Sequence, residues 1–360
     1  PGKKVMYTSL IFGRSVRSVF KVISIEKFIS FPIYQATFNV SSKFICVINF
    51  IKKMSNLNIK DSFSKELIIG FSRKNKIIPS KFHYDLKGSK YFEKITKAKE
   101  YYVTRTEKEI LQKIAPKIHS MFGNSLTFIE FGSGSTEKIK ILLNDQVKFY
   151  MPLDISFDFI KESSKKLIKS FPKLKILPTY CDYAKYLRLP KNISKTKIGF
   201  FLGSSIGNFY NLEEKKFLKN AKKTLGSNSF LFVGVDLIKN RKILKKAYND
   251  SGGFAAQFNL NLITRMNNEL KTKLKKRDFK YVSSFNKKNS CIQSFILSKK
   301  NQTLRLNKRK FFLKKGEKIQ TETSKKFTFK TFSKLAKSSG WKVSNYWHDK
   351  KKYYSIFLLK

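Results

Sequence analysis

Acidic residues and glycines follow two short apolar runs in the middle of the chain. Residues 125–131 are apolar and β-prone, and they run into Gly132-Ser-Gly134 after the acid Glu130. Asp154 ends the next apolar run, twenty residues after Gly134. Glycine allows a backbone to approach a ligand without a Cβ clash, and a carboxylate at that spacing can accept both hydroxyls of a ribose. The pattern therefore favours a bound nucleoside-containing cofactor.

A third apolar run, residues 176–181, ends in Asp182-Tyr183, where an acid or a backbone N–H can meet an adenine edge. The glycine loop lacks the third glycine of a dinucleotide fingerprint and the Gly-Lys-Ser/Thr of a phosphate-binding loop. Two alternatives stay open on these residues alone. The glycines can serve only as turns of an ordinary doubly wound α/β domain, or the cofactor can be a nicotinamide.

Strands and helices alternate around these loops. The sequence predicts strands at residues 125–131, 148–154, 176–181, 197–202 and 230–236, and helices at residues 137–143 and 213–225, the second closed by Gly226. Near the end of the chain we expect a helix over residues 329–339 and two strands around Asp349-Lys350, which complete the sheet with an antiparallel strand. This order suits an α/β, Rossmann-like S-adenosylmethionine-dependent methyltransferase.

Six segments, in order over about residues 60–360, carry a closer resemblance. They are Lys81 to Glu93, Tyr101 to Glu107, Glu130 to Ser135 with Lys138, Phe201 to Asn208, Ala247 to Asn261 and Thr321 to Phe327. Together they resemble the histidine-specific, S-adenosylmethionine-dependent Nα-methyltransferases of ergothioneine biosynthesis. The resemblance implies a class I methyltransferase domain with a second α+β substrate-binding domain. It also implies that three methyl groups are added to L-histidine, which yields hercynine.

The resemblance also implies roles for particular side chains. Asn208 and Tyr248 would hold the substrate carboxylate, and Glu322 and Ser324 would hold the imidazole. Of the other substrate-side residues, Tyr84 would lie near the amine, Phe92 would form an apolar wall and Gly203 would line the pocket floor. The cofactor contacts would be Gly132, Ser133, Gly134, Lys138, Asp154, Asp182 and Tyr183. No metal is expected.

Each of these residues also has a purely structural interpretation. Tyr84, Phe92 and Tyr248 can be packing residues, Asn208 a turn residue, and Glu322 a solvated charge among lysines. The segment Ser290-Cys-Ile-Gln-Ser-Phe departs from the family, which tends to have a bulky apolar residue near the ring pocket. Ile292, Ser294 or Phe295 would take that place here. A different amino-acid substrate is therefore an alternative.

The composition adds a second alternative. The chain of 360 residues has a net charge of +52 and is 41% hydrophobic, which excludes a fully disordered chain. Such basicity invites an RNA-binding methyltransferase, but 66 of the 76 basic residues are lysines spread along the chain, as a low-GC genome would also produce. We expect a small-molecule substrate, no specific nucleic acid and a monomer.

Cysteine and histidine usage bears on the cellular location of the protein. Three scattered cysteines and three histidines show neither disulfide nor metal-ligand spacing, and no apolar run of about 18 residues can span a membrane. A reduced, cytoplasmic location is expected.

The chain is expected to divide into three parts. Residues 1–54 would form an extension, either an organellar targeting segment or residues upstream of a start at Met54. Residues 55–105 and 238–326 would form the substrate-binding domain. Residues 106–237 and 327–360 would form the cofactor-binding domain. Because ligands of open α/β sheets bind at the carboxyl ends of the strands, the loops after the first, second and fourth strands should face the crevice.

Overall fold

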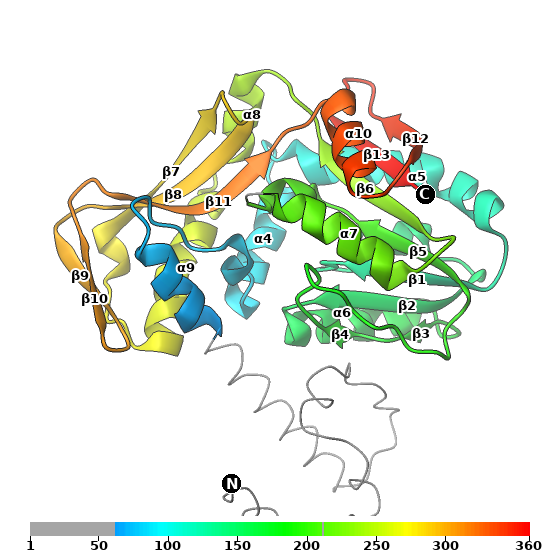
Figure 1. Ribbon diagram of the computed structural model, residues 1–360, viewed down its shortest axis with the longest axis horizontal. Helices are drawn as coiled ribbons and strands as arrows, with labels where there is room; N and C mark the ends of the chain where they lie inside the picture. Colours follow the sequence, from blue (N-terminus) through cyan, green and yellow to red (C-terminus); the bar gives the residue numbers. More distant parts are fainter. Residues whose placement is uncertain (1–61, 211) are drawn as a thin grey trace, which may run out of the picture.

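A computed structural model of the chain describes residues 62–210 and 212–360, so the predictions for residues 1–54 lie outside the described residues. The larger sheet has the order β12-β13-β6-β5-β1-β2-β3, and β4 also pairs with β2 (Figure 1). Its strands are β1 (Leu126–Phe131), β2 (Val147–Asp154), β3 (Lys175–Ile176), β4 (Thr179–Tyr180), β5 (Thr196–Phe201), β6 (Phe230–Asp236), β12 (Val343–His348) and β13 (Tyr354–Leu359). This is the predicted Rossmann-like α/β architecture.

Strand direction in this sheet also follows the prediction. The strands β1, β2, β5 and β6 run parallel to one another, whereas β13 runs antiparallel to β6 and to β12. The predicted third strand, residues 176–181, is instead two short strands separated by Leu177 and Pro178. Pro178 interrupts the ladder because proline has no backbone N–H to donate.

The helix predicted at residues 137–143 is wrong: only the short 3-10 helix η2 (Ile139–Leu142) forms there. The segment is too short, because the Asn144 side chain accepts a hydrogen bond from the Gln146 N–H at 3.0 Å and β2 begins one residue later. The long helix α5 (Tyr102–Phe122) packs against η2, and its His119 is 2.8 Å from the Leu142 carbonyl oxygen. Residues 182–195, after β4, also form a loop in place of a helix.

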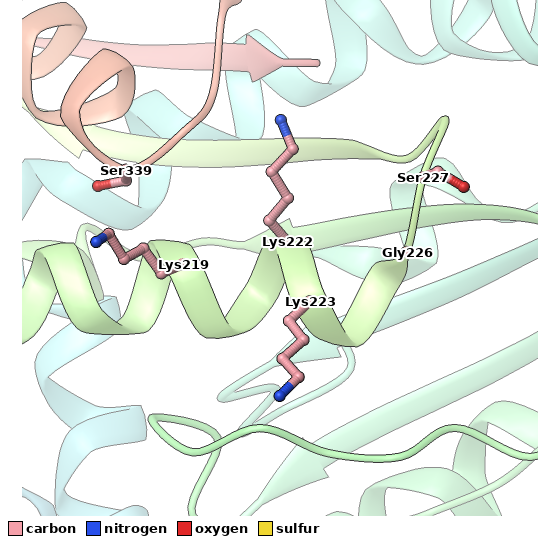
Figure 2. Close-up of a pocket in the computed structure, with 6 residues that line it drawn as sticks. All are labelled: Lys219, Lys222, Lys223, Gly226, Ser227 and Ser339. Carbon is pink, nitrogen blue, oxygen red and sulfur yellow. The ribbon is translucent and has the colours of Figure 1, made fainter.

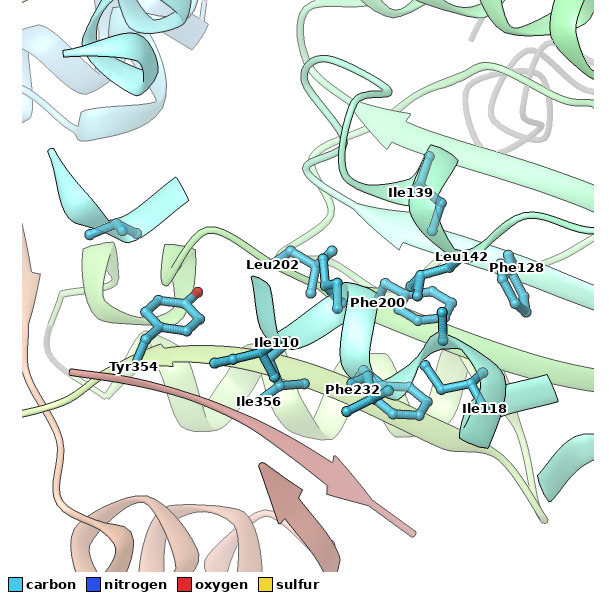
Figure 3. Close-up of a cluster of buried hydrophobic side chains, with 14 of the residues drawn as sticks. Ile110, Ile118, Phe128, Ile139, Leu142, Phe200, Leu202, Phe232, Tyr354 and Ile356 are labelled. Carbon is cyan, nitrogen blue, oxygen red and sulfur yellow. The ribbon is translucent and has the colours of Figure 1, made fainter. Parts of the chain in front are cut away.

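Alternate residues of each strand point to opposite faces of the sheet, so the sheet builds two cores. Figure 3 shows Phe200, Phe232 and Ile356 of the strands packed against Ile110 and Ile118 of α5. The opposite face packs against α7 and α10. These helices are α7 (Glu213–Leu225) and α10 (Phe329–Ser338), with α6 (Phe157–Ser170) beside β2. The prediction for α7 is confirmed at both ends.

A smaller antiparallel sheet, in the order β11-β8-β7, lies beside the larger one (Figure 1). Its strands are β7 (Phe279–Asn286), β8 (Cys291–Ser298) and β11 (Lys318–Lys325), next to the hairpin of β9 (Gln302–Leu306) and β10 (Arg309–Leu313). The surrounding helices are residues 62–71, η1 (Ser80–His83), α4 (Leu86–Lys97), α8 (Arg241–Ala247), α9 (Phe254–Leu270) and η4 (Lys276–Asp278). The predicted boundaries of the two domains remain a prediction.

The two sheets meet at the loop after β5. The short helix η3 (Ser205–Asn208) contacts β11, and a Cβ atom at Gly207 would lie only 2.6 Å from the Lys325 carbonyl oxygen. Glycine is therefore required at position 207 for this close backbone approach. The contact places the loop that carries Asn208 next to the strand that carries Glu322 and Ser324.

Candidate cofactor and substrate site

Two glycine turns at the carboxyl end of the larger sheet form an open cradle. Gly132 and Gly134, after β1, have φ angles of +68° and +52°, and Gly203, after β5, has φ +75°. These are left-handed conformations that side chains disfavour, and a Cβ at Gly134 would meet nothing within 4 Å. The turn at Gly134 therefore has open space beside its backbone.

Asp154, at the end of β2, is tied to the first glycine turn. Its carboxylate accepts hydrogen bonds from the Gly134 N–H at 3.1 Å and the Ser156 N–H at 2.8 Å. Burial raises the pKa of Asp154, and these backbone N–H groups oppose that rise. Each carboxylate oxygen keeps acceptor capacity beyond these single bonds, as a pair of ribose hydroxyls would require.

Asp182 and Tyr183 close the same end of the sheet. The Asp182 carboxylate accepts from the Ala184 N–H at 3.2 Å and lies 3.5 Å from the Lys81 Nζ. The Tyr183 ring lies against Gly132, where a Cβ would come within 3.1 Å of it. The structure thus brings together the residues that the sequence placed after the first three apolar runs.

Glu107 is a residue of this region that the sequence did not single out as functional. Its fully buried carboxylate accepts hydrogen bonds from the Gly203 N–H at 2.8 Å, the Tyr354 hydroxyl at 2.6 Å and the Lys138 ammonium at 3.0 Å. A Cβ at Gly234 would lie 2.1 Å from this carboxylate, so glycine there makes room for it. Glu107 therefore fixes both Lys138 and the turn at Gly203.

The predicted substrate residues meet on the smaller sheet. The Tyr248 hydroxyl, just after α8, is 2.6 Å from the Ser324 hydroxyl on β11. Glu322, on the same strand, accepts a hydrogen bond at 3.2 Å from Ser294 of the neighbouring strand β8. Burial raises the pKa of Glu322 to about 7, although Lys326 and Ser294 act in the opposite direction.

Tyr84 lies between the cofactor residues and the substrate residues. Burial raises the pKa of its hydroxyl well above the usual value, and the nearby Glu322, Tyr183 and Asp154 raise it further. Its ring makes edge contacts with Phe92 at 5.7 Å and with a phenylalanine of α9 at 5.5 Å, while its carbonyl oxygen accepts from the Ser156 hydroxyl. Tyr84 therefore connects the two groups of residues.

His83, next to Tyr84, has a structural role in the packing of this region. Its ring is buried, stacks on Phe258 at 4.5 Å and bonds to the Ser80 carbonyl oxygen at 2.9 Å. Burial lowers the pKa of His83 to about 4, so the ring is neutral near pH 7.

The sequence that builds this geometry is similar to a known family over most of its length. Residues 63–360 match the family described as histidine-specific methyltransferase, SAM-dependent. The chain belongs to this family. Among its relatives, the histidine N-alpha-methyltransferase of Mycolicibacterium smegmatis is 27% identical over 296 residues, which cover 80% of this chain and 92% of that protein.

Two fungal relatives show how the family varies. Ergothioneine biosynthesis protein 1 of Neurospora crassa is 34% identical over 197 residues, 53% of this chain and 22% of that protein. N-methyltransferase imqF of Aspergillus flavus is 26% identical over 299 residues, 79% of this chain and 81% of that protein. The chain is thus an S-adenosylmethionine-dependent methyltransferase with the Rossmann-like fold of such enzymes.

The glycine cradle fits the methyl donor of this methyltransferase. Gly134 leaves open space beside its backbone, Ser133 is buried in the first turn, and Asp154 offers an acceptor for hydroxyls. Among the described residues, no group of three or more His, Cys, Asp or Glu side chains could hold a metal ion. No helix in residues 62–210 and 212–360 is long and apolar enough to cross a membrane.

A shallow hollow on the other side of the methyltransferase fold shares no residue with this site. Figure 2 shows it along α7, with a volume of about 390 Å³ and lined by Lys219, Lys222, Lys223, Gly226, Ser227 and Ser339. Lys222 donates to the Gly340 carbonyl oxygen and lies over the Trp341 ring. The hollow is a gap between lysine side chains at the contact of α7 and α10.

Two further residues near the substrate side went unassigned from the sequence. Tyr101 packs its ring 6.3 Å from both Tyr248 and Phe92. Lys326 contacts Tyr248 and Ser324. Both residues lie in resembling segments, which is a usable signal, although Lys326 is also one of a lysine pair in a lysine-rich chain.

Proposed function

We propose that the protein methylates the α-amine of L-histidine three times and releases hercynine, the trimethylated betaine. Membership of the histidine-specific methyltransferase family and similarity to bacterial histidine N-alpha-methyltransferases support this substrate. The observation that carries the proposal is the position of Tyr84: its carbonyl oxygen accepts from Ser156, which also donates to Asp154, and its ring packs 5.7 Å from Phe92. A methyl transfer needs its two reactants at such a junction.

The substrate-side residues can hold the two ends of histidine. Tyr248 and Asn208 would bind the carboxylate, and Glu322 and Ser324 would bind the imidazole. A substrate with an apolar side chain would give the buried Glu322 no ring N–H beyond its bond from Ser294, at a cost of about 1–3 kcal/mol. That cost supports selectivity for a ring that carries an N–H.

The methyl donor, held by Gly132, Ser133, Gly134, Lys138, Asp154, Asp182 and Tyr183, would supply an electrophilic methyl group when bound. The attacking amine must be neutral, and Tyr84 remains protonated near neutral pH because its pKa is raised. Tyr84 therefore cannot act as the base in its resting form, but its oxygen can accept an amine N–H and orient the nitrogen. The surrounding Phe92 and Tyr101 rings exclude water from the same place.

A second candidate substrate is another amino acid methylated at its α-amine. Ser294 favours this candidate, because a small polar residue contacts Glu322 where the family tends to have a bulky apolar side chain. Fungal relatives with other N-methyltransferase names also belong to this similarity group. The shape of the pocket around Ser294 then decides which side chain is accepted.

The test is mass spectrometry of the purified protein incubated with S-adenosylmethionine and the twenty amino acids. We expect three methyl groups on histidine alone, and loss or redirection of this activity in Glu322→Ala. Glu317→Ala is the matched control, because Glu317 pairs with Lys76 just before the same strand and should leave activity unchanged. Methylation of a different amino acid would select the second candidate. Absence of any methylated amino acid would refute both, and RNA would be the next substrate tested.

A further inference from the structure

Lys326 is a fully buried lysine that directly contacts two of the proposed substrate residues. Its ammonium has three N–H donors, and the structure supplies three acceptors: Asp236 at 2.7 Å, Tyr248 at 2.9 Å and Ser324 at 2.8 Å. The Tyr248 and Ser324 hydroxyls are also 2.6 Å from each other. Every ammonium proton is therefore used inside the cluster.

This arrangement restricts what the two hydroxyls can do. Each hydroxyl has one proton, and one of the two protons lies between the Tyr248 and Ser324 oxygens. One hydroxyl proton remains for a group outside the cluster. Because both oxygens already accept from a charged donor, that remaining O–H is polarised and becomes a stronger donor. The pair is thus prepared to meet an anion.

The charges behind the pair favour the same ligand. Asp236 lies between two ammonium groups, those of Lys326 and Lys239, and Tyr102 donates to it at 2.8 Å. Burial alone would raise the pKa of Asp236, but the two lysines lower it below its usual value, so it is ionised. Of the two ammonium groups, the one of Lys326 contacts the Tyr248 hydroxyl directly, at 2.9 Å, and Asp236 holds it in that place.

We propose that Lys326 is a positioning residue for the substrate carboxylate: it donates to both hydroxyls, so that Ser324 donates to Tyr248 and the Tyr248 proton points to the carboxylate, and it supplies the positive charge behind Tyr248. This inference rests on the proposed function, since it concerns the same amino-acid site. Lys326 acts through Tyr248 and Ser324 and does not touch the reacting atoms. It explains how a buried site can attract a carboxylate without an arginine in contact with it.

The experiment compares Lys326→Met with the matched variant Lys239→Met. Both remove one ammonium group from Asp236, but Lys239 contacts Tyr102 and Asp236 and not the hydroxyl pair. Calorimetry measures binding of L-histidine and of histidinol, which lacks the carboxylate, in the presence of S-adenosylhomocysteine. We expect Lys326→Met to weaken histidine binding at least tenfold, to leave histidinol binding within about twofold, and to raise KM more than it lowers kcat. Lys239→Met should keep the histidine-over-histidinol preference of the wild type.

Three outcomes would overturn the proposal: equal losses in the two variants, equal losses for the two ligands, or no loss in Lys326→Met. If Lys326→Met fails to fold, Lys326→Gln keeps amide donors for Asp236 and one hydroxyl, and the same loss of preference is expected. The proposed function fails separately, when the wild-type protein itself neither binds nor methylates histidine. An intact wild-type activity with an unchanged preference in Lys326→Gln would reject only the role of Lys326.

Discussion

Two buried charge clusters lie side by side on one face of β6, and they bond to different residues of the proposed site. Gly234 makes room for Glu107, which holds Lys138 and the turn at Gly203. Two residues further along the strand, on the same face, Asp236 holds Lys326 and Lys239. The first cluster pairs one carboxylate with one ammonium group. The second pairs one carboxylate with two.

The difference matches what each half has to recognise. The Glu107 cluster acts on backbone, because its partner at the cofactor loop is the Gly203 N–H. The Asp236 cluster acts on side chains, because Lys326 bonds to the Tyr248 and Ser324 hydroxyls. A loop that presents backbone needs only to be fixed in place. Hydroxyls that bind an anion also need a direction for their protons and a positive charge behind them.

The largest expected effect comes from removing the charge at the centre of the second cluster. Asp236→Asn would leave two buried ammonium groups without a counter-charge, and we expect the free energy of unfolding to fall by about 3–5 kcal/mol. Urea denaturation measures this loss. Asp278→Asn is the control, because Asp278 pairs with the exposed Lys300 and its loss should change the free energy of unfolding far less. Similar losses in both variants would show that the Asp236 cluster is not a buried ion network.

The next effect separates Asp236 from Glu322 by the sign of their pH dependence. Burial raises the pKa of Glu322 from about 4.5 to about 7, so the folded protein holds a proton that the unfolded chain releases. The contribution of Glu322 to the free energy of unfolding therefore falls as the pH rises from about 4.5 to about 7. Glu322→Gln cannot ionise, so it should become more stable relative to the wild type between pH 4 and pH 8, by on the order of 1–3 kcal/mol.

Denaturation curves of wild type and Glu322→Gln at pH 4, 6 and 8 measure this difference. Asp236 should behave in the opposite way, because its pKa is lowered and its stabilisation is lost as the pH falls through that folded-state value. A stability difference for Glu322→Gln that does not change with pH would contradict the buried position of its carboxylate.

A third prediction concerns the first cluster alone. Glu107→Gln removes the charge that holds Lys138 and weakens the acceptor for the Gly203 N–H, so S-adenosylmethionine should bind about tenfold more weakly. Glu109→Gln on the exposed side of the same helix is the control. Calorimetric titration with the methyl donor measures the change. If Lys326→Met weakened this binding equally, the two clusters would not serve separate halves.

The sequence predicted well what is contiguous in the chain. Each predicted cofactor loop follows a β-prone run and begins with a glycine or an acidic residue. The bounds of α7 follow from an acidic first turn and from Gly226, so local signals were sufficient for both. The prediction of a helix at residues 137–143 was wrong. The apolar spacing there is helical, but β2 begins too soon after the segment for a full α-helix to form. The roles of the substrate residues came from the family resemblance and remain predictions.

The two charge clusters could not be predicted from the sequence. Glu107 bonds to residues 96 and 247 positions away, and no local pattern encodes such partners. Lys326 is one of 66 lysines, and only the fold distinguishes a fully buried lysine from those on the surface. Contacts between side chains that are distant in the sequence could therefore be found only in the structure.

The smallest expected effect is at Ser294, which borders the substrate half without belonging to either cluster. Ser294→Ala removes the hydrogen bond to Glu322 at 3.2 Å, a loss of about 0.5–1.5 kcal/mol, so KM for histidine should rise about threefold and binding of the methyl donor should not change. Ser298→Ala on the same strand is the control, because that hydroxyl bonds to the Lys300 carbonyl oxygen away from the site. Steady-state kinetics with both substrates measure the change. An unchanged KM would mean that β11 alone fixes the position of Glu322. Substrate recognition near Glu322 would then depend on the Asp236 cluster and not on the Ser294 hydroxyl of β8.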